Sequence, residues 1–327
     1  MQYFLGVDLG GTKTHAVIVD QTGRVVGFGE GGPGNHESVG YNGMYESLSA
    51  ALQGALGSAR LDAKAVSGAG FGIAGYDWPS ERPRTLEVIN RLGLDAACTV
   101  VNDAVPSLAA GAEAGWGVVV ISGTGCNCLG WDREHKREGR VTGFGTSMGE
   151  GAGASELLFR ALQLVGRSWS QRLPATRLSD MFVEYTGARD LDDFIEGYTQ
   201  GNYPVRPDIA PRIFAVARQG DAVAADLIHW AGTELGEMAN CVIRQLGFEA
   251  LSFDVVFSGS MFRAGEMLVA PMRAAIYQIA PRARLVRLAA PPVMGAVLLG
   301  MSAAGFSPAP SIRSALAESL NETVPGT

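Results

Sequence analysis

The chain has 327 residues, of which 47% are hydrophobic and 18% are charged, and its formal net charge at pH 7 is −7. This length predicts about two domains, each large enough to bury a core. The acidic balance provides no electrostatic footprint for nucleic acid or for an anionic membrane, and no stretch reaches the roughly 20 apolar residues of a membrane span. We therefore expect no nucleic-acid partner and no membrane partner.

The four cysteines indicate a reducing compartment. They lack a CxxC spacing and stand in apolar or glycine-rich surroundings, unlike a disulfide framework or a zinc site; they are Cys98, Cys126, Cys128 and Cys241. The first residues lack the basic segment of a signal peptide, and a strand pattern starts at Leu5. We therefore expect a cytoplasmic protein.

The first twenty residues predict a β-hairpin whose tip binds an anion. One apolar run ends at Gly10-Gly11-Thr12-Lys13-Thr14, and a second apolar run follows at once. Paired glycines let backbone N–H groups approach a phosphate, the hydroxyls of Thr12 and Thr14 can donate to it, and Asp8 can hold a cation directly or through water. A Walker A loop and a dinucleotide fingerprint are excluded, because both need a different spacing and a following helix. An ordinary glycine-rich turn is the alternative.

The residues after this hairpin alternate between helix and strand patterns. The expected elements are a helix from Tyr41 to Ser58, a strand from Ala65 to Ile73, a helix from Arg84 to Arg91, a strand from Cys98 to Val101 and a helix from Ala104 to Ala112. Asp103 stands between the last strand and the last helix, where open α/β sheets place ligands. Aspartate is also a preferred helix cap, so the local pattern leaves both roles open.

The pattern then begins again after a boundary at Glu113 to Gly117. A strand from Gly117 to Ile121 leads into Ser122-Gly123-Thr124-Gly125, and a second strand runs from Cys126 to Trp131. A strand, a Gly/Thr turn and a returning strand have thus appeared twice, which predicts a duplicated phosphate-binding hairpin. Two such tips facing each other across a cleft could clamp a triphosphate. A chance second Gly-Thr turn is the alternative.

The last third of the chain is mostly helical in pattern. Helices are expected near 154–165, 178–185, 190–199, 210–219 and 222–246, strands at 253–257 and 283–288, and a final hydrophobic helix from Pro291. Gly259-Ser260 follows a buried strand, and a glycine there permits close approach of the backbone to a planar ligand such as adenine.

Five motifs occur in the order seen in the actin/hexokinase/Hsp70-like ATPases. They are Gly6-Val7-Asp8-Leu9-Gly10-Gly11-Thr12-Lys13, Asn102-Asp103-Ala104, Ser122-Gly123-Thr124-Gly125-Cys126-Asn127-Cys128, Ser258-Gly259-Ser260 and Pro291-Pro292-Val293-Met294-Gly295-Ala296. Within that superfamily the chain resembles the BadF/BadG/BcrA/BcrD ATPase family, and most of all its N-acetylglucosamine kinase branch. The matching segments span about residues 3 to 300.

The resemblance implies an α/β protein with two ribonuclease H-like domains that flank a central cleft. The expected domains are residues 1–114, on the sugar side with the first phosphate turn, and residues 115–327, with the second phosphate turn and the adenosine site. The tail from about 305 is expected to pack back on the first domain. The implied activity is transfer of the γ-phosphate of ATP, with Mg²⁺, to the 6-hydroxyl of an amino sugar, N-acetylglucosamine before others, in a homodimer.

The resemblance also implies roles for single residues. Asp103 would be the catalytic base, and Asp8 would organise Mg²⁺ through water. The expected ATP-binding residues are Gly10, Gly11, Thr12, Lys13, Gly123, Thr124 and Gly125 at the phosphates, with Gly220, Gly259 and Ser260 at the adenosine. The expected sugar-binding residues, besides Asp103, are Asn35, Asn127, Gly143, Phe144, Gly145 and Glu150.

One departure from the family pattern concerns the sugar. The branch shows Gly-Trp-Gly and then Gly-Asp-Glu-Gly, whereas this chain has Gly143-Phe144-Gly145 and then Gly149-Glu150-Gly151-Ala152. Glucosamine, N-acetylmannosamine, a muramic acid sugar or another hexose therefore remain open as substrates. Two functions of other classes also remain open. The cysteine placement argues against an ATPase activator of an iron–sulfur enzyme, and the start of the first strand at residue 3 argues against a sugar sensor with an added DNA-binding segment.

Overall fold

The computed structural model describes residues 1–324, and two five-stranded sheets organise them. The chain divides into two compact units. The first unit comprises Met1–Val119, Gly130–Lys136 and the residues from Val286 onward, and the second comprises Val120–Leu129 and Arg137–Leu285. Strands and helices alternate through the first half of the chain, and the predicted α/β class is confirmed. No helix in residues 1–324 is long and apolar enough to cross a membrane.

The first sheet has the strand order β3-β2-β1-β4-β5. Its strands are β1 (Tyr3–Leu9), β2 (Thr14–Asp20), β3 (Val25–Gly31), β4 (Val66–Ile73) and β5 (Ala97–Asn102). The first three strands pair antiparallel, and β4 pairs parallel with both β1 and β5. Leu9 lies opposite Thr14 in the register, so the predicted first hairpin is confirmed and its tip is residues 10–13.

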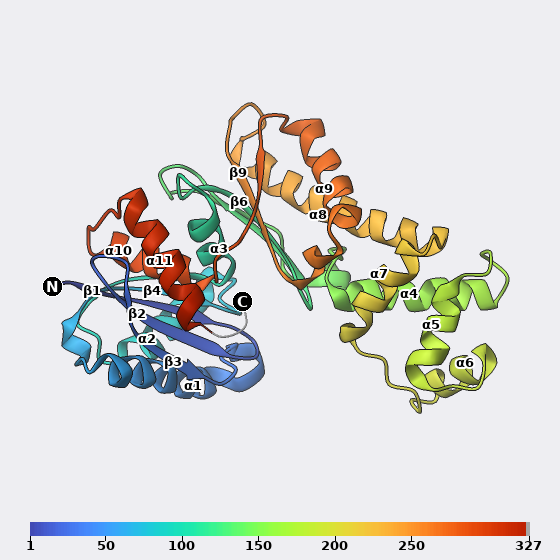
Figure 1. Cartoon of the computed structure of the whole chain (residues 1–327), viewed down its shortest axis with the longest axis horizontal. Helices are drawn as coiled ribbons and strands as arrows, with labels where there is room; N and C mark the ends of the chain where they lie inside the picture. Colours follow the sequence, from blue (N-terminus) through green and yellow to red (C-terminus); the bar gives the residue numbers. More distant parts are fainter. Residues whose placement is uncertain (325–327) are drawn as a thin grey trace. The chain divides into compact units, whose positions relative to one another are not determined.

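Helices cover both faces of this sheet (Figure 1). α1 (His36–Ala59) packs on β2 and β3, and α10 (Val293–Ala303) packs on β1 and β4. Successive side chains of a strand point to opposite faces, so Leu5 belongs to the core under α1 and Phe4 to the core under α10. Glycines in the strands let the helices approach closely, since a Cβ at Gly29 would lie 2.1 Å from the Ala51 carbonyl oxygen.

The C-terminal helices belong with the first sheet. A Cβ at Gly70 of β4 would lie 2.0 Å from the carbonyl oxygen of Ala296, so α10 rests directly on the strand backbone. The hydroxyl of Ser319, in α11 (Pro310–Thr323), accepts a 3.0 Å hydrogen bond from the Val25 amide of β3. The predicted division at residue 114 differs from these compact units, because residues from 286 onward group with the N-terminal sheet. The other helices of this unit are α2 (Arg82–Asn90) and α3 (Ala104–Gly111).

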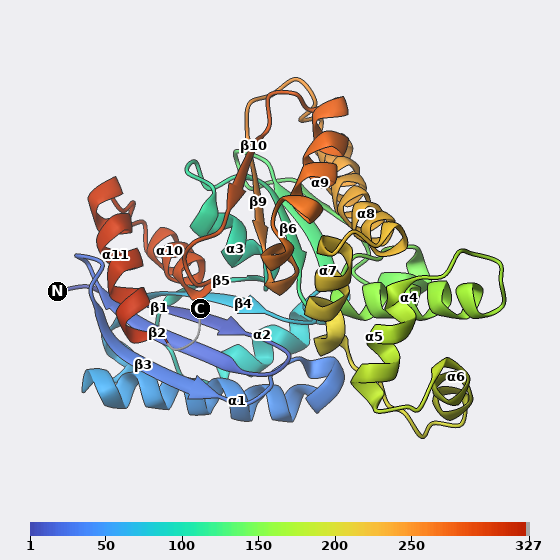
Figure 2. The same cartoon turned by 45° about the vertical axis from the view of Figure 1, so that its right-hand side comes forward.

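The second sheet has the strand order β10-β9-β6-β7-β8. Its strands are β6 (Gly117–Ser122), β7 (Cys126–Trp131), β8 (Glu138–Arg140), β9 (Asp254–Ser258) and β10 (Arg284–Arg287). The helices are α4 (Ala154–Trp169), α5 (Arg177–Thr186), α6 (Leu191–Thr199), α7 (Ala210–Arg218), α8 (Ala222–Leu246) and α9 (Glu266–Ile279). α8 and α9 lie side by side (Figure 2), and Gly232 of α8 permits this because a Cβ there would lie 2.4 Å from the Leu268 carbonyl oxygen.

Among the elements that differ from the sequence-based expectation are two helices. α1 begins at His36, five residues before the predicted start, and it continues past Gly40, whose φ of 68° is non-helical. Asn35 starts this helix by accepting a hydrogen bond from the Glu37 amide. α11 was not predicted, because it buries only Leu316 and Leu320 and so shows little apolar periodicity.

Candidate active site

Three loops of the first unit meet at the end of β1. The Ala74 amide donates to the Leu9 carbonyl oxygen at 2.9 Å, and the Gly34 amide donates to the Gly10 carbonyl oxygen at 3.0 Å. The hairpin tip, the connection that leads to Asn35 and the loop that follows β4 are therefore joined by backbone hydrogen bonds. The carboxyl ends of parallel strands are where such sheets place ligands.

The tip of the first hairpin is exposed, and no other part of the described chain covers its centre at Gly11. Gly11, Thr12 and Lys13 are exposed, and a Cβ at Gly11 would meet no atom within 4 Å. Thr14 differs from the expectation that its hydroxyl donates to an anion. Its side chain is fully buried, and its Oγ1 donates to the Gly32 carbonyl oxygen at 2.9 Å, so this hydroxyl holds β2 against β3 instead.

Asp8 and Asp103 are partly buried acids, and the charge of Asp8 acts on Asp103. Burial raises the pKa of Asp8 to about 6, and the positive charge of Lys13 opposes this shift. Burial also raises the pKa of Asp103 to about 7, and the charges of Asp8 and Asp77 raise it further, against a lowering by the amides of Asp103 and Ala104. Both carboxyl groups thus titrate closer to neutral pH than an exposed aspartate does.

The structure bears on one of the two roles that the local pattern left open for Asp103, the helix cap. Asp103 stands at the N-cap position of α3, yet its side chain makes no capping hydrogen bond. The preceding residue does so, because Asn102 Oδ1 accepts from the Ala104 amide at 2.9 Å. The carboxylate of Asp103 is therefore not used as a helix cap and is available for chemistry.

Residues 1–324 contain no group of three or more His, Cys, Asp or Glu side chains placed to hold a metal ion. Asp8 nevertheless fits a divalent cation held through water. It is a partly buried carboxylate whose charge is disfavoured by desolvation, and its charge acts on a second partly buried carboxylate at Asp103. Two such charges repel each other, and a cation beside Asp8 would relieve that repulsion. Oxygen atoms are the ligands that Mg²⁺ prefers.

The side chain of Asn35 is held in place by its own helix. Oδ1 accepts from the Glu37 amide at 2.8 Å, and Nδ2 lies 3.3 Å from a carboxylate oxygen of Glu37. Asn35 also contacts the loop after β4, since a Cβ at Gly75 would lie 2.4 Å from Asn35 Oδ1. Its predicted contact with the sugar stays a prediction.

In the second unit, the Gly123–Gly125 turn is joined to the start of α4. The amides of Ala154 and Ser155 donate to the carbonyl oxygens of Gly123 and Thr124, both at 2.9 Å. A Cβ at Gly123 would meet no atom within 4 Å, so the outer side of the turn is open. The turn therefore has room for the predicted phosphate, and the contact itself stays a prediction.

The predicted sugar loop is organised by Glu150. Its Oε1 accepts from the Thr142 amide at 2.6 Å, and its Oε2 accepts from the Gly143 amide at 2.8 Å. Gly143 and Gly145 have φ values of 76° and 62°, which bend the loop around this carboxylate. Asn127 Oδ1 lies 3.8 Å from the position of a Cβ at Gly143. Glu150, Gly143 and Asn127 thus form one cluster in the second unit.

Phe144 lies at the tip of this loop with 58% of its surface exposed. An exposed aromatic ring beside polar groups suits contact with a sugar ring. That contact was predicted from the resemblance and stays a prediction.

The glycines predicted at the adenosine have structural reasons of their own. Gly259 has a φ of 119°, and a Cβ there would lie 2.0 Å from the Ser122 carbonyl oxygen. The close approach that requires glycine is therefore made by the protein backbone, whereas the expectation was an approach by adenine. Gly220 has a φ of 90° and ends α7, while Asp221 begins α8 by accepting from the Ala224 amide. The role of Gly220, Gly259 and Ser260 toward adenosine stays a prediction.

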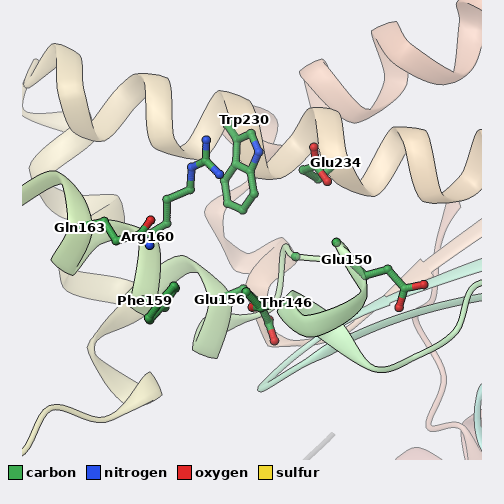
Figure 3. Close-up of a pocket in the computed structure, with 10 residues that line it drawn as sticks. Thr146, Glu150, Glu156, Phe159, Arg160, Gln163, Trp230 and Glu234 are labelled. Carbon is green, nitrogen blue, oxygen red and sulfur yellow. The ribbon is translucent and has the colours of Figure 1, made fainter.

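A cavity of about 330 Å³ lies in the second unit between α4, α8 and the loop that carries Glu150 (Figure 3). The guanidinium of Arg160 stacks on the ring of Trp230 at 4.0 Å. Glu150 is one of the residues that line this cavity, and its carboxylate points away from Trp230. Sequence reasoning assigned no role to the lining residues of the two helices, although 156, 159, 160 and 163 recur at helical spacing.

A family model identifies the chain. The model of the BadF/BadG/BcrA/BcrD ATPase family matches residues 5–300. The chain belongs to this family. Membership confirms the resemblance predicted from the five motifs, and it implies that the protein uses ATP.

Two curated relatives span nearly the whole chain. The N-acetyl-D-glucosamine kinase of Dictyostelium discoideum is 26% identical over 314 residues, which cover 92% of this chain and 98% of the relative. The N-acetylmuramic acid/N-acetylglucosamine kinase of Clostridium acetobutylicum is 25% identical over 305 residues, covering 92% and 99%.

Solved structures confirm the fold. A protein of Chromobacterium violaceum, provisionally described as an N-acetylglucosamine kinase, has a TM-score of 0.66 at 24% identity and covers 91% of this chain and 99% of its own. A ROK family glucokinase from Streptomyces griseus, in complex with glucose and AMPPNP, has a TM-score of 0.52 at 21% identity and covers 98% and 99%. At these identities both structural similarities show the fold and not the activity.

Proposed function

We propose that this protein is an ATP-dependent kinase that transfers the γ-phosphate of ATP to the 6-hydroxyl of N-acetylglucosamine. Family membership supports the use of ATP, and the two curated relatives support an amino-sugar acceptor. The observation that carries the reaction type is the partly buried carboxyl group of Asp103, which is not used as a cap and has its pKa raised to about 7.

Asp103 accepts the proton of the sugar 6-hydroxyl in this proposal. The hydroxyl oxygen forms a bond to the γ-phosphorus, the bond from that phosphorus to the β–γ bridging oxygen breaks, and ADP leaves. Phosphoryl transfer needs mainly positioning and charge neutralisation, with a carboxylate placed to take the hydroxyl proton. A base whose pKa lies near the working pH is partly ionised and can accept the proton, and it is also basic enough to keep that proton.

The other predicted residues bind and orient the two substrates. The open Gly10–Lys13 and Gly123–Gly125 turns would offer backbone amides to phosphate oxygens. Asp8 would hold Mg²⁺ through water, and the ion supplies neutralisation of phosphate charge when bound. The residues proposed to contact the sugar are Asn35, Asn127, Phe144 and Glu150.

One assay tests the acceptor and the reaction together. ADP release is measured with Mg-ATP and a panel containing N-acetylglucosamine, glucosamine, N-acetylmannosamine, N-acetylmuramic acid and glucose. We expect the highest kcat/KM for N-acetylglucosamine and a product phosphorylated at O6. N-acetylmuramic acid is the second candidate, because one curated relative is named for both sugars. ADP release that no sugar increases would contradict the proposal. A homodimer stays a prediction from the resemblance, and a cytoplasmic location stays a prediction from the cysteines and the first residues.

A further inference from the structure

The loop after β4 supports both residues of the first unit that the proposed reaction needs near the sugar. One end of this loop is Gly75, whose Cα lies against the side chain of Asn35, so that a Cβ would stand 2.4 Å from Asn35 Oδ1. Two residues later, Asp77 Oδ1 accepts a 2.9 Å hydrogen bond from Asn102 Nδ2. Asn102 directly precedes Asp103.

Asn102 is buried and uses both ends of its amide. Nδ2 donates to Asp77 and also lies 3.3 Å from the Tyr76 carbonyl oxygen, while Oδ1 accepts from the Ala104 amide. The side chain thereby ties the loop to the first turn of α3 on both sides of Asp103. The backbone turn from which the Asp103 side chain projects is therefore held on both sides.

The backbone at Asp77 is held by Glu81. The amides of Asp77 and Trp78 both donate to Glu81 Oε2 at 2.8 Å. The other oxygen of Glu81 lies 3.7 Å from Nε2 of His36, whose ring stacks on Tyr41 at 4.5 Å between ring centroids. His36 follows Asn35 at the start of α1. A continuous set of contacts therefore runs from the Asn35 turn through Glu81 and Asp77 to the Asp103 turn.

We propose that Asp77 is a positioning residue for Asp103, acting through its hydrogen bond to Asn102. This inference rests on the proposed function, in which Asp103 takes the proton of the sugar hydroxyl. The bond orients a backbone turn and touches no reacting atom. Its loss should therefore lower kcat and leave the binding of ATP unchanged.

The test uses the two partners of the hydrogen bond. Asp77→Ala removes the acceptor, Asp77→Asn keeps an oxygen that can accept from Asn102, and Asn102→Asp sets two carboxylates against each other. The double variant Asp77→Asn with Asn102→Asp restores a bond with donor and acceptor exchanged, and its new carboxylate can still accept from the Ala104 amide. The matched control is Asp95→Asn, an exposed acid of the same unit.

We expect Asp77→Ala to lose about 10²-fold in kcat, since a misplacement of about 1 Å can cost that much. The KM for ATP should not change, Asp77→Asn should lose less, and the double variant should recover activity relative to Asn102→Asp alone. The proposal is overturned if Asp77→Ala has the kinetics of Asp95→Asn. It is also overturned if the double variant is no more active than Asn102→Asp.

A second readout separates this inference from the proposed function. ATP hydrolysis is measured in the same variants without sugar, where water replaces the hydroxyl as the group that gives up its proton. If no sugar increases ADP release by the wild type, the kinase proposal alone is overturned. The positioning role is then still supported if the variants rank in ATP hydrolysis as we expect them to rank in kcat. If Asp77→Ala does not fold, the comparison of Asn102→Asp with the double variant decides.

Discussion

The backbone amide of Gly143 donates to Oε2 of Glu150 at 2.8 Å, while the other carboxylate oxygen accepts from Thr142. Glu150 therefore shapes the predicted sugar loop from inside. The resemblance suggested that this longer acid would reach a sugar hydroxyl as the shorter aspartate of the family would. In the structure this carboxylate accepts hydrogen bonds from two successive amides, and its contact with a sugar hydroxyl stays a prediction.

Shortening this side chain should loosen the loop. In Glu150→Asp the carboxylate cannot reach both amides, and a hydrogen bond to a charged group contributes about 1.5–3 kcal/mol. We expect kcat/KM for the sugar to fall about 10- to 100-fold while the KM for ATP stays the same. Steady-state kinetics with each substrate varied checks this, and Glu249→Asp, at an exposed position, is the matched control. A rise in sugar kcat/KM would show that the family's aspartate suits this loop better.

Removing the carboxylate of Asp103 should stop the chemistry without stopping ATP binding. We expect Asp103→Asn to lower kcat by about 10²- to 10⁴-fold, the usual contribution of general-base assistance. Calorimetry with a non-hydrolysable ATP analogue should give a Kd near that of the wild type. An Asp103→Asn protein that keeps its kcat would remove Asp103 from the mechanism.

The same substitution should change how stability depends on pH. The pKa of Asp103 is raised from 3.8 to about 7 in the folded protein, so the folded state holds a proton that the unfolded state has released between these values. Folding stability must then fall as pH rises from about 4 to 7. Asp103→Asn cannot ionise, so we expect it to be more stable than the wild type at pH 8, by at most about 4 kcal/mol, and not at pH 4.

Urea unfolding at the two pH values measures this difference. Asp8 shifts in the same direction and is unchanged in both proteins, so its contribution largely cancels. Asp95→Asn serves as the control, because an exposed acid should show the same small effect at both pH values. Equal stabilities of Asp103→Asn and wild type at pH 8 would contradict the raised pKa.

Gly259 should not tolerate a side chain. Alanine there would need a φ of 119° and would place Cβ 2.0 Å from the Ser122 carbonyl oxygen, so β9 would have to separate from β6. We expect Gly259→Ala to destabilise the protein by more than the roughly 1–3 kcal/mol of backbone strain alone. Gly166→Ala is the control, since it lies in α4 with no atom near its Cβ and should stabilise by about 0.5–1 kcal/mol. Denaturant titration separates the two outcomes.

Arg313 fastens α11 to the end of α3. Its Nη2 donates to the carbonyl oxygens of Ala109 at 3.1 Å and Ala110 at 3.4 Å, which lie in the last turn of α3. We expect Arg313→Ala to cost about 1–3 kcal/mol and to speed hydrogen exchange in 310–323, because buried carbonyl groups lose their donor. Arg24→Ala, at an exposed position of the same unit, should change neither quantity. Unchanged exchange in Arg313→Ala would show that apolar packing alone holds α11.

Local sequence determined the two hairpins and the place of Asp103. Each hairpin depends on a short apolar run, a Gly/Thr turn and a second run, and these signals act between neighbouring residues. Asp103 follows a buried strand and precedes a helix, so its position at the carboxyl end of β5 was readable from the chain. Helices as long as α8 carried enough periodicity for both ends to be predicted.

Only the tertiary structure decided the surroundings of these residues. Asp103 is freed from capping by Asn102, and its pKa depends on Asp8 and Asp77, which come from other strands and loops. The reason for Gly259 is the Ser122 carbonyl, and α10 joins the first sheet because glycines of β1 and β4 admit its backbone. Burial and Coulomb interactions depend on distance in space, so residues far apart in the sequence set them and no local pattern records them.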